Sequence, residues 1–224
     1  MEFKVENGDG IDSWKEVTLV YSAALRQMET KMQILNDEFQ HVHQYNPIEH
    51  IKARIKTPES IVKKLKRYGQ ESTIDKMVKY INDIAGSRII CSFTSDIYRI
   101  ADMIRDQRDI KVIAVKDYIT YPKASGYKSY HMIVSIPVYL SDRTVDTKVE
   151  VQIRTVAMDF WASLEHKIHY KFEGDAPENI KNELVECARM VSDLDARMLS
   201  LNEEILAISK KREEEKQLNS GTSK

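Results

Sequence analysis

The chain has 224 residues, of which 42% are hydrophobic, so it is long enough to bury a core of its own. Its 34 Lys and Arg residues nearly balance 35 Asp and Glu residues, and the net charge of -1 excludes a general attraction to nucleic acid or anionic membranes. Cys91 and Cys187 lie in apolar segments, which excludes a disulfide framework and predicts a reducing, cytoplasmic location. Neither a membrane span nor a signal peptide is predicted, because no long apolar run occurs and the start "MEFKVENGDG" is polar and acidic.

Helices are predicted over the first third of the chain. Apolar residues recur at helical spacing, which predicts one long amphipathic helix from an N-cap at Asp12 to about Gln40. The segment "NPIEH" breaks this helix, and "SIVKKLKRYG" predicts a short helix closed by Gly69. A further helix is expected over about 72–85, ending at Gly86.

Strands alternate with helices in the middle of the chain. The segments "RIICSF", "IKVIAV" and "YHMIVSIPVYL" are predicted strands, and "DIYRIADMIRDQ" is a predicted helix. The clearest strand is "KVEVQIR", in which aliphatic residues alternate with polar ones. This order predicts an α+β fold, with a mixed sheet flanked by helices.

The C-terminal third is expected to be helical. One helix is predicted over about 155–171 and a long final helix from Glu178 to beyond Ile208. The last residues, "KKREEEKQLNSGTSK", are charged and polar. We therefore expect a single domain over 1–210 with long terminal helices, followed by a disordered tail over 211–224.

Two carboxylates stand at positions that carboxylates disfavour. Asp83 is expected in the last turn of its helix, where the helix dipole costs a negative side chain about 0.3–1 kcal/mol. Glu150 stands in the middle of a strand, on a face shared with Gln152 and Arg154. This face is either simply solvated or the floor of a cleft. Two carboxylates brought together would suit Mg²⁺ bound along with substrate phosphates.

Basic residues provide complementary charge. The run "HIKARIKTPESIVKKLKR" includes Arg54, Lys56 and Lys64, and Arg88 follows Asp83. Such a run is either a solvated helix face or a site for polyphosphate, because guanidinium and ammonium groups match phosphate oxygens. The chain has no Gly-rich phosphate-binding loop, so side chains would have to hold the phosphates.

A tyrosine stands in a basic loop. In "KASGYKSYH", Tyr127 follows Gly126 and lies among Lys123, Lys128 and His131. Gly126 lets the loop turn sharply, and an exposed aromatic ring among cations can stack on a nucleobase.

Several motifs in order carry a specific resemblance. The segments "RIKTPESIVKK", "INDIAGSRI", "YPKASGYKSYH", "VEVQIRT" and "MDFWASLEHKIHYKF" resemble those of the small alarmone synthetases, the synthetase-only relatives of the RelA/SpoT-homologue enzymes. The resemblance covers about residues 40–172. It implies a nucleotidyltransferase-like fold that transfers the β,γ-pyrophosphate of ATP to the ribose 3′-hydroxyl of GDP or GTP, with GMP as another candidate acceptor. The products would be an alarmone and AMP.

The resemblance also assigns residues. It gives Asp83 and Glu150 to Mg²⁺, with Glu150 close to the attacking hydroxyl, and it stacks Arg88 on adenine. The phosphates of ATP would be held by Arg54, Lys56 and Lys64. Tyr127 would stack on guanine, and the residues expected around the acceptor or on the cleft floor are Lys123, Lys128, His131, Gln152 and Arg154. Lys116 departs from the pattern, because some relatives place a second arginine against adenine there.

Other interpretations of the sequence are open to test. His166 and His169 with Glu165 could bind metal, but surface histidines are expected. A nucleic-acid nucleotidyltransferase would carry a D-x-D pair on a strand, whereas Asp193 and Asp195 fall on the last helix, where a solvated face is expected. A non-catalytic module that binds single-stranded RNA would leave Asp83 and Glu150 unexplained. No histidine is followed by aspartate, so alarmone hydrolysis is not expected.

The final helix carries an apolar seam. Steps of three and four residues join Leu184, Cys187, Val191, Leu194, Met198, Leu201, Ile205 and Ile208. The seam could pack on the first helix of the same chain or on another copy. The resemblance implies a homotetramer, and in some relatives single-stranded RNA or the alarmone acts as a regulator. We therefore expect a homo-oligomer, with a tetramer as its form.

Overall fold

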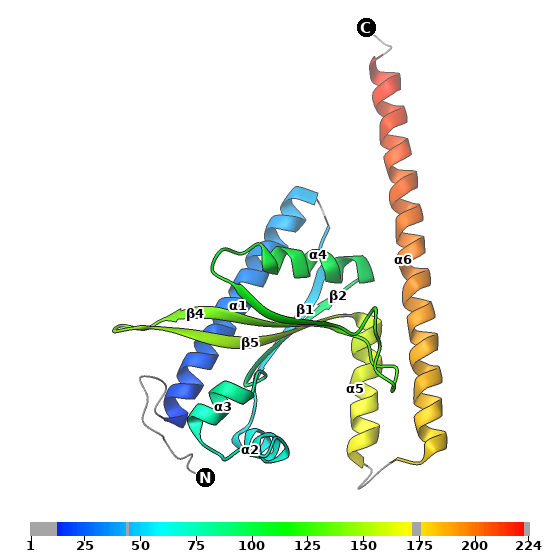
Figure 1. Cartoon of the computed structure of the whole chain (residues 1–224). Helices are drawn as coiled ribbons and strands as arrows, with labels where there is room; N and C mark the ends of the chain where they lie inside the picture. Colours follow the sequence, from blue (N-terminus) through cyan, green and yellow to red (C-terminus); the bar gives the residue numbers. More distant parts are fainter. Residues whose placement is uncertain (1–12, 44, 172–175, 222–224) are drawn as a thin grey trace.

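A computed structural model describes residues 13–43, 45–171 and 176–221 (Figure 1). Within these residues, five strands form one sheet and six helices surround it. In chain order the elements are α1 (Trp14–His43), β1 (Ile48–Ile55), α2 (Pro58–Arg67), α3 (Ile74–Tyr80), β2 (Ala85–Cys91), α4 (Thr94–Arg105), β3 (Lys111–Asp117), β4 (Tyr130–Tyr139), β5 (Thr144–Thr155), α5 (Val156–Lys171) and α6 (Glu178–Gly221).

The sheet is mixed and has β5 at its centre. The strand order is β1-β2-β5-β4-β3, in which β2 and β5 run parallel and the other pairs antiparallel. The predicted α+β class with a mixed, helix-flanked sheet is confirmed. The central position of β5 matters for function, because its polar residues are held between neighbouring strands on both sides.

One face of the sheet is the hydrophobic core. Val149, Val151 and Ile153 of β5 are fully buried. They pack in one cluster with α1, which contributes Val17, Met28 and other residues, and with the buried face of α4 (Figure 1). Burial of this aliphatic face stabilises the fold at roughly 25 cal/mol per Å² of apolar surface. The opposite face of the same strands is left to polar side chains.

The structure differs from the sequence predictions around β1 and α3. β1 was not predicted, because an edge strand that carries lysine and arginine has the composition of a solvated helix. α3 ends at Tyr80, so Asp83 lies in the loop before β2 and not in a last helical turn. The amine of Lys148 donates to the carbonyl oxygens of Val78 and Lys79 and closes α3 there.

Two predictions concern the ends of the chain. Asp12, the predicted N-cap of α1, lies outside the described residues, whereas the hydroxyl of Ser13 accepts a hydrogen bond from the amide of Glu16. At the other end α6 continues to Gly221, and the expected disorder of 211–224 stays a prediction. The run "KKREEEKQL" consists of strong helix formers with lysine and glutamate four residues apart, which explains the helix.

α6 packs chiefly on α5 and along a shorter stretch on α4, and it runs at a distance from α1 (Figure 1). Asp195 fixes the point at which α6 passes the end of β5 and the start of α4, because its buried carboxylate accepts hydrogen bonds from the hydroxyls of Thr155 and Thr94. Burial raises the pKa of Asp195. The prediction that Asp195 belongs to a solvated face is therefore wrong, because periodicity alone does not reveal which side of a helix meets a neighbour.

Candidate active site

The predicted site residues form rows across the polar face of the sheet. Strand pairing aligns one row in the order Lys52, Arg88, Gln152, His131 and Lys116. The next row contains Arg54, Gly86 and Glu150. Because neighbouring strands lie about 4.8 Å apart, each row brings cations from distant parts of the chain beside β5. The polar face of β5 is therefore a cleft floor.

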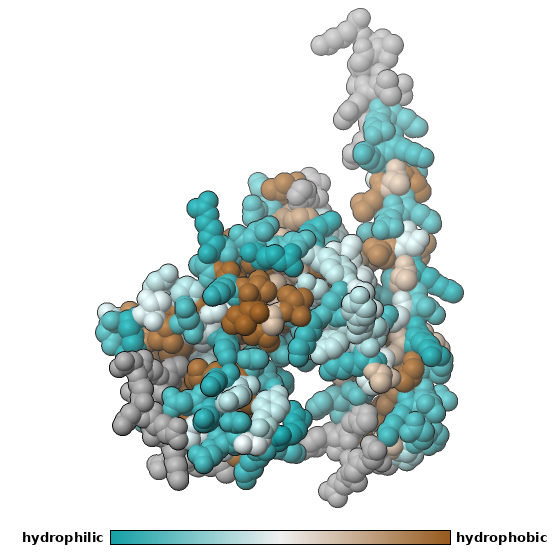
Figure 2. Space-filling view, viewed as in Figure 1, coloured by the Kyte–Doolittle hydropathy of each residue, from teal (hydrophilic) through white to brown (hydrophobic). Residues whose placement is uncertain are grey.

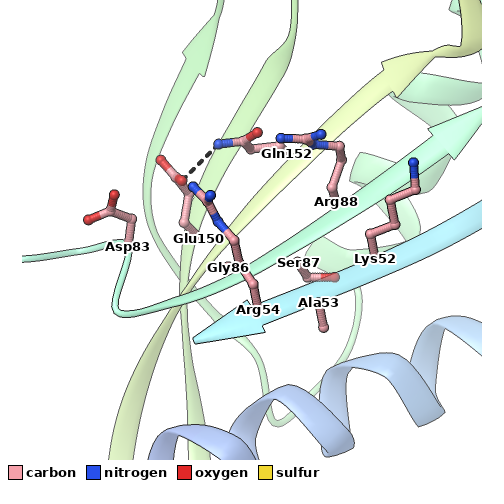
Figure 3. Close-up of a pocket in the computed structure, with 9 residues that line it drawn as sticks. All are labelled: Lys52, Ala53, Arg54, Asp83, Gly86, Ser87, Arg88, Glu150 and Gln152. Carbon is pink, nitrogen blue, oxygen red and sulfur yellow. Dashed lines mark hydrogen bonds between the residues drawn. The ribbon is translucent and has the colours of Figure 1, made fainter. Parts of the chain in front are cut away.

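A first hollow lies over β1, β2 and β5 (Figure 3). Its cations are Lys52, Arg54 and Arg88, and its floor includes Gln152 and Gly86. Asp83 and Glu150 line the hollow at one end, as Figure 3 shows. Gly86 faces Arg54, and its missing side chain leaves the space between Arg54 and Glu150 open.

A second hollow lies on the other side of the same two carboxylates. Asp83 and Glu150 line it together with four basic residues, Lys64, Lys116, Lys123 and His131. Tyr68, Tyr80 and Tyr118 supply aromatic walls. The two hollows therefore share one acidic junction and are each lined by cations, which suits two phosphorylated ligands that meet at the carboxylates.

Asp83 is held in place by two lysines. Its Oδ2 lies 2.9 Å from Nζ of Lys56, and its Oδ1 lies 2.8 Å from Nζ of Lys64. Burial alone would raise the pKa of Asp83, but the hydrogen bonds and charges of Lys64 and Lys56 outweigh it and lower the pKa. Asp83 is therefore ionised at neutral pH, and the loop that carries it is tied to α2.

Glu150 is kept ionised by different partners. Its Oε2 accepts a hydrogen bond from Nε2 of Gln152 at 2.9 Å, and its Oε1 lies 3.6 Å from Nδ1 of His131. Burial would raise the pKa of Glu150, and the negative charge of Asp83 acts in the same direction. The hydrogen bonds and charge of the partners prevail and lower the pKa. The mutual effect of Asp83 and Glu150 agrees with their common position in both hollows.

Tyr127 lies between the cleft and α6. Its hydroxyl accepts a hydrogen bond from Nη2 of Arg154 and lies 2.9 Å from Nε2 of His131. Nζ of Lys123 lies 4.6 Å from the centre of the ring, and the other side of the loop packs on the small cluster that includes Trp161 and Ala188. The ring is thus half-buried and surrounded by cations.

The loop that carries Tyr127 also packs directly on α6. Gly126 has a φ of +85°, and a Cβ added there would come within 2.5 Å of the Cβ of Ala188. A side chain at this position would therefore require both backbone strain and displacement of the helix. The glycine that the sequence suggested for a sharp turn also permits close packing of the loop on α6.

The structure brings most of the predicted residues together, but Tyr127 lines neither hollow, although its hydroxyl lies beside His131 of the second one, and three further residues depart from expectation. Lys116 lines the second hollow and lies three strands from Arg88, about 14 Å away by the strand spacing. Lys128 faces the groove between the loop and α6. Arg154 lies beneath Tyr127, is 4% exposed and lines neither hollow. The roles predicted for these residues, like those of the other site residues, stay predictions.

Sequence analysis missed Tyr118 and Asp159, and it gave no individual role to Lys52, which belongs to the basic run. Lys52 shares a face with Arg54 at the two-residue period of a strand, a signal that recognition of β1 would have revealed. Asp159, in the first turn of α5, forms ion pairs with Arg88 and Arg154. No pattern in the sequence pointed to Tyr118. His166 is exposed, and the side chain of His169 lies outside the described residues.

Comparison with known proteins identifies the family. Residues 53–175 match the model described as "Region found in RelA / SpoT proteins". The chain belongs to this family. It is 48% identical to GTP pyrophosphokinase YwaC of Bacillus subtilis over 87% of this chain and 93% of the relative.

Two solved structures of RelA/SpoT-family proteins share the fold. The small alarmone synthetase 1 of Bacillus subtilis bound to its product pppGpp superposes with a TM-score of 0.79 at 33% identity, covering 86% of this chain and 97% of that one. The same synthetase bound to AMPCPP gives a TM-score of 0.74 at 30% identity, covering 87% and 98%. The resemblance inferred from the motifs is confirmed.

The donor set at the junction can be compared with what a metal ion needs. Among the described residues, no cluster of three or more His, Cys, Asp or Glu side chains could hold a metal by itself. Asp83 and Glu150 supply two ionised carboxylates at the meeting point of two cationic hollows. This set fits Mg²⁺ that completes its coordination with phosphate and water.

Within the described residues, none of the helices combines the length and apolar character needed to cross a bilayer.

The ion pairs of Asp83 predict a pH-dependent contribution to stability. The folded pKa of Asp83 lies below its unfolded value, so the contribution is present above about pH 4 and is lost as the pH falls through the folded pKa. We expect Asp83→Asn to lower the free energy of unfolding at pH 7 by about 1–3 kcal/mol, because two partly buried lysines lose their partner. Urea unfolding at pH 7 and pH 3 measures the difference, which should shrink at pH 3.

The matched control is Asp75→Asn, at an exposed aspartate in the first turn of α3. It should change stability by less than about 0.5 kcal/mol. Equal stability of wild type and Asp83→Asn at pH 7 would contradict the structural role of these ion pairs.

Proposed function

We propose that the chain is a GTP pyrophosphokinase of the small alarmone synthetase type. It transfers the pyrophosphate of ATP to the 3′-hydroxyl of GDP or GTP, with GMP as a further candidate acceptor, and releases AMP. The observation that carries the proposal is the pair of cationic hollows that meet at Asp83 and Glu150. The relatives bound to pppGpp and to AMPCPP, an analogue of ATP, support the same two nucleotide classes.

ATP occupies the first hollow in this proposal. Arg88 stacks on adenine, and Arg54 reaches the phosphates from the neighbouring row. Lys56 and Lys64 bind the phosphates nearest the junction, where they now pair with Asp83. Lys52, which also lines the first hollow, adds to the positive potential.

The guanine nucleotide occupies the second hollow. Tyr127 stacks on guanine, taking the place that Lys123 has over the ring, and Lys123 then contacts the acceptor phosphates. Because Lys116 lines this hollow, we assign it to the acceptor and not to adenine. His131, Gln152 and Arg154 position Glu150 and Tyr127, and Lys128 extends the positive surface of the loop.

The reaction needs positioning and charge neutralisation more than a nucleophilic side chain. The 3′-oxygen of the acceptor attacks the β-phosphorus of ATP, the bond between that phosphorus and the oxygen bridging to the α-phosphorus breaks, and AMP departs with the bridging oxygen. Glu150, ionised at neutral pH, accepts the proton of the hydroxyl. Lysine and arginine side chains around the junction offset the negative charge of the transferred group.

Mg²⁺ is the proposed cofactor. Asp83 and Glu150 would hold it, and it would supply charge neutralisation on the phosphate oxygens and help to align them. The proposed location is the cytoplasm, where ATP and guanine nucleotides are available as substrates.

Assembly of several copies is part of the proposal. Leu194, Met198, Leu201, Ile205 and Ile208 of the predicted seam are each about half exposed, and Figure 2 shows brown side chains along α6 away from the body of the molecule. An apolar stripe of this length on a single helix favours association with another copy. We propose a homotetramer that buries it.

The activity is tested by incubation with labelled ATP, Mg²⁺ and each of GMP, GDP and GTP, followed by chromatography. We expect AMP and a guanosine nucleotide that carries pyrophosphate on its 3′-oxygen. Asp83→Asn and Glu150→Gln should each lower kcat at least a hundredfold, equivalent to about 2.7 kcal/mol, whereas Asp75→Asn should not. Absence of product with folded protein would overturn the proposed function.

Tyr127 is tested by substitution of its ring. Stacking on a base contributes about 1–3 kcal/mol, so Tyr127→Ala should lower kcat/KM for GDP by roughly 5- to 150-fold. Tyr127→Phe keeps the ring and should have a smaller effect, limited to the lost hydrogen bonds with Arg154 and His131. Tyr121→Ala, at a strongly exposed tyrosine in the same loop, is the control. If binding of AMPCPP changes as much as kcat/KM for GDP, Tyr127 does not belong to the acceptor side alone.

The assembly is tested by light scattering coupled to size exclusion at micromolar protein. We expect a mass near four times the 26.0 kDa of one chain. Combined Met198→Glu and Leu201→Glu should dissociate the oligomer into folded chains, because both side chains are exposed on a single chain. Combined Arg197→Glu and Ser200→Glu, at exposed polar positions of the same helix, should leave it intact. A wild-type mass near 26.0 kDa would contradict the proposal.

A further inference from the structure

Asp159 is a buried carboxylate that lies beside the first hollow but does not line it. It stands in the first turn of α5, directly after β5. Its Oδ1 accepts hydrogen bonds from Nη1 of Arg88 at 3.1 Å and Nη1 of Arg154 at 3.2 Å, and its Oδ2 lies 3.6 Å from Nζ of Lys52. One carboxylate therefore joins cations that come from β1, β2 and β5.

The two arginines need this carboxylate. Burial lowers the pKa of Arg88, and the positive charge of Arg154 lowers it further, whereas Asp159 opposes both effects. The guanidinium groups of Arg88 and Arg154 share a single oxygen of Asp159. Without the negative charge, two partly desolvated cations would repel each other, and neither would keep its present position. The place of Arg88 in the first hollow thus depends on Asp159.

Hydrogen bonds continue from Arg154 to the acceptor side. Nη2 of Arg154 donates to the hydroxyl of Tyr127 and, at 3.0 Å, to Oε1 of Gln152. Gln152 in turn donates to Glu150 at 2.9 Å, and Tyr127 lies 2.9 Å from His131. Two routes therefore lead from Asp159, one to the ring proposed for guanine and one to the carboxylate at the junction.

A role in stabilising the helix alone does not account for this arrangement. A carboxylate in the first turn of a helix interacts favourably with the helix dipole even when it is exposed, as Asp75 is in α3. Asp159 is instead buried and binds two guanidinium groups, that of Arg88, which lines the first hollow, and that of Arg154, which contacts Tyr127. Asp159 therefore supports one side chain of the first hollow and one that contacts Tyr127.

We propose that Asp159 is a positioning residue that sets Arg88 for the donor nucleotide and Arg154, with Tyr127, for the acceptor, and so links the two substrate sites. The inference rests on the proposed function. It places the link in a residue that touches neither substrate. Loss of the charge should therefore weaken the use of both nucleotides, whereas a change in Arg88 or in Tyr127 should weaken the use of one.

The test is Asp159→Asn, which preserves shape and hydrogen-bond acceptance by Oδ1 but removes the charge. Charge-assisted hydrogen bonds are stronger than neutral ones by about 1–1.5 kcal/mol, so we expect the KM for ATP and the KM for GDP each to rise about tenfold. Arg88→Met should raise chiefly the KM for ATP and Tyr127→Phe chiefly the KM for GDP. Asp75→Asn is the matched control and should change neither.

Unchanged KM values, or a change for one nucleotide alone, would overturn the inference. If Asp159→Asn does not fold, Asp159→Glu replaces it: the charge remains but moves by one methylene group, so both KM values should still rise together, by a smaller factor. Product formation by the wild type is measured first. Its absence would refute the proposed function, whereas a wild type that turns over beside an Asp159→Asn variant with normal KM values refutes only the inference.

Discussion

The ion pairs of Asp83 with Lys56 and Lys64 join the end of β1, helix α2 and the loop before β2 at one end of the sheet. Lys56 follows β1, Lys64 belongs to α2, and Asp83 lies in the loop before β2. The carboxylate of Asp83 and the ammonium groups of the two lysines are partly buried and pair with each other, so α2 is held over the end of the cleft. In the proposed complex, the same lysines can contact phosphates at the junction. The ion pairs therefore keep two ammonium groups at the place where the substrates meet.

The central position of β5 makes this arrangement possible. Its aliphatic residues are covered by α1 and α4, and its other face carries Glu150, Gln152 and Arg154 in successive rows. A polar face at the centre of a sheet is costly unless each group finds a partner. Here Gln152 donates to Glu150 and accepts from Arg154 along β5, and His131 of β4 lies 3.6 Å from Glu150. Packing of the apolar face therefore fixes the positions of the polar side chains on the opposite face.

The sequence predicted features that depend on local pattern and not those that depend on contacts between elements. The alternation in β5 and the helical spacing of α1, α4 and α6 are visible in single segments, so the sheet and the carboxylate at Glu150 could be predicted. β1 escaped notice because its lysine and arginine residues belong to the cleft and its composition resembles that of a helix. Contacts between elements were not predicted, because strand order and helix crossing are not visible in a local stretch of sequence. They determine the role of Asp159, the burial of Asp195 and the distance of Lys116 from Arg88.

The central claim is that two nucleotides bind on opposite sides of one acidic junction. A crystal structure of the protein with AMPCPP, GDP and Mg²⁺ tests it most directly. The account predicts the donor over Arg54 and Arg88, the acceptor between Lys116 and the loop of Tyr127, and the metal ion on Asp83 and Glu150. A structure with both nucleotides on the same side of these carboxylates, or with the metal ion held elsewhere, would contradict it.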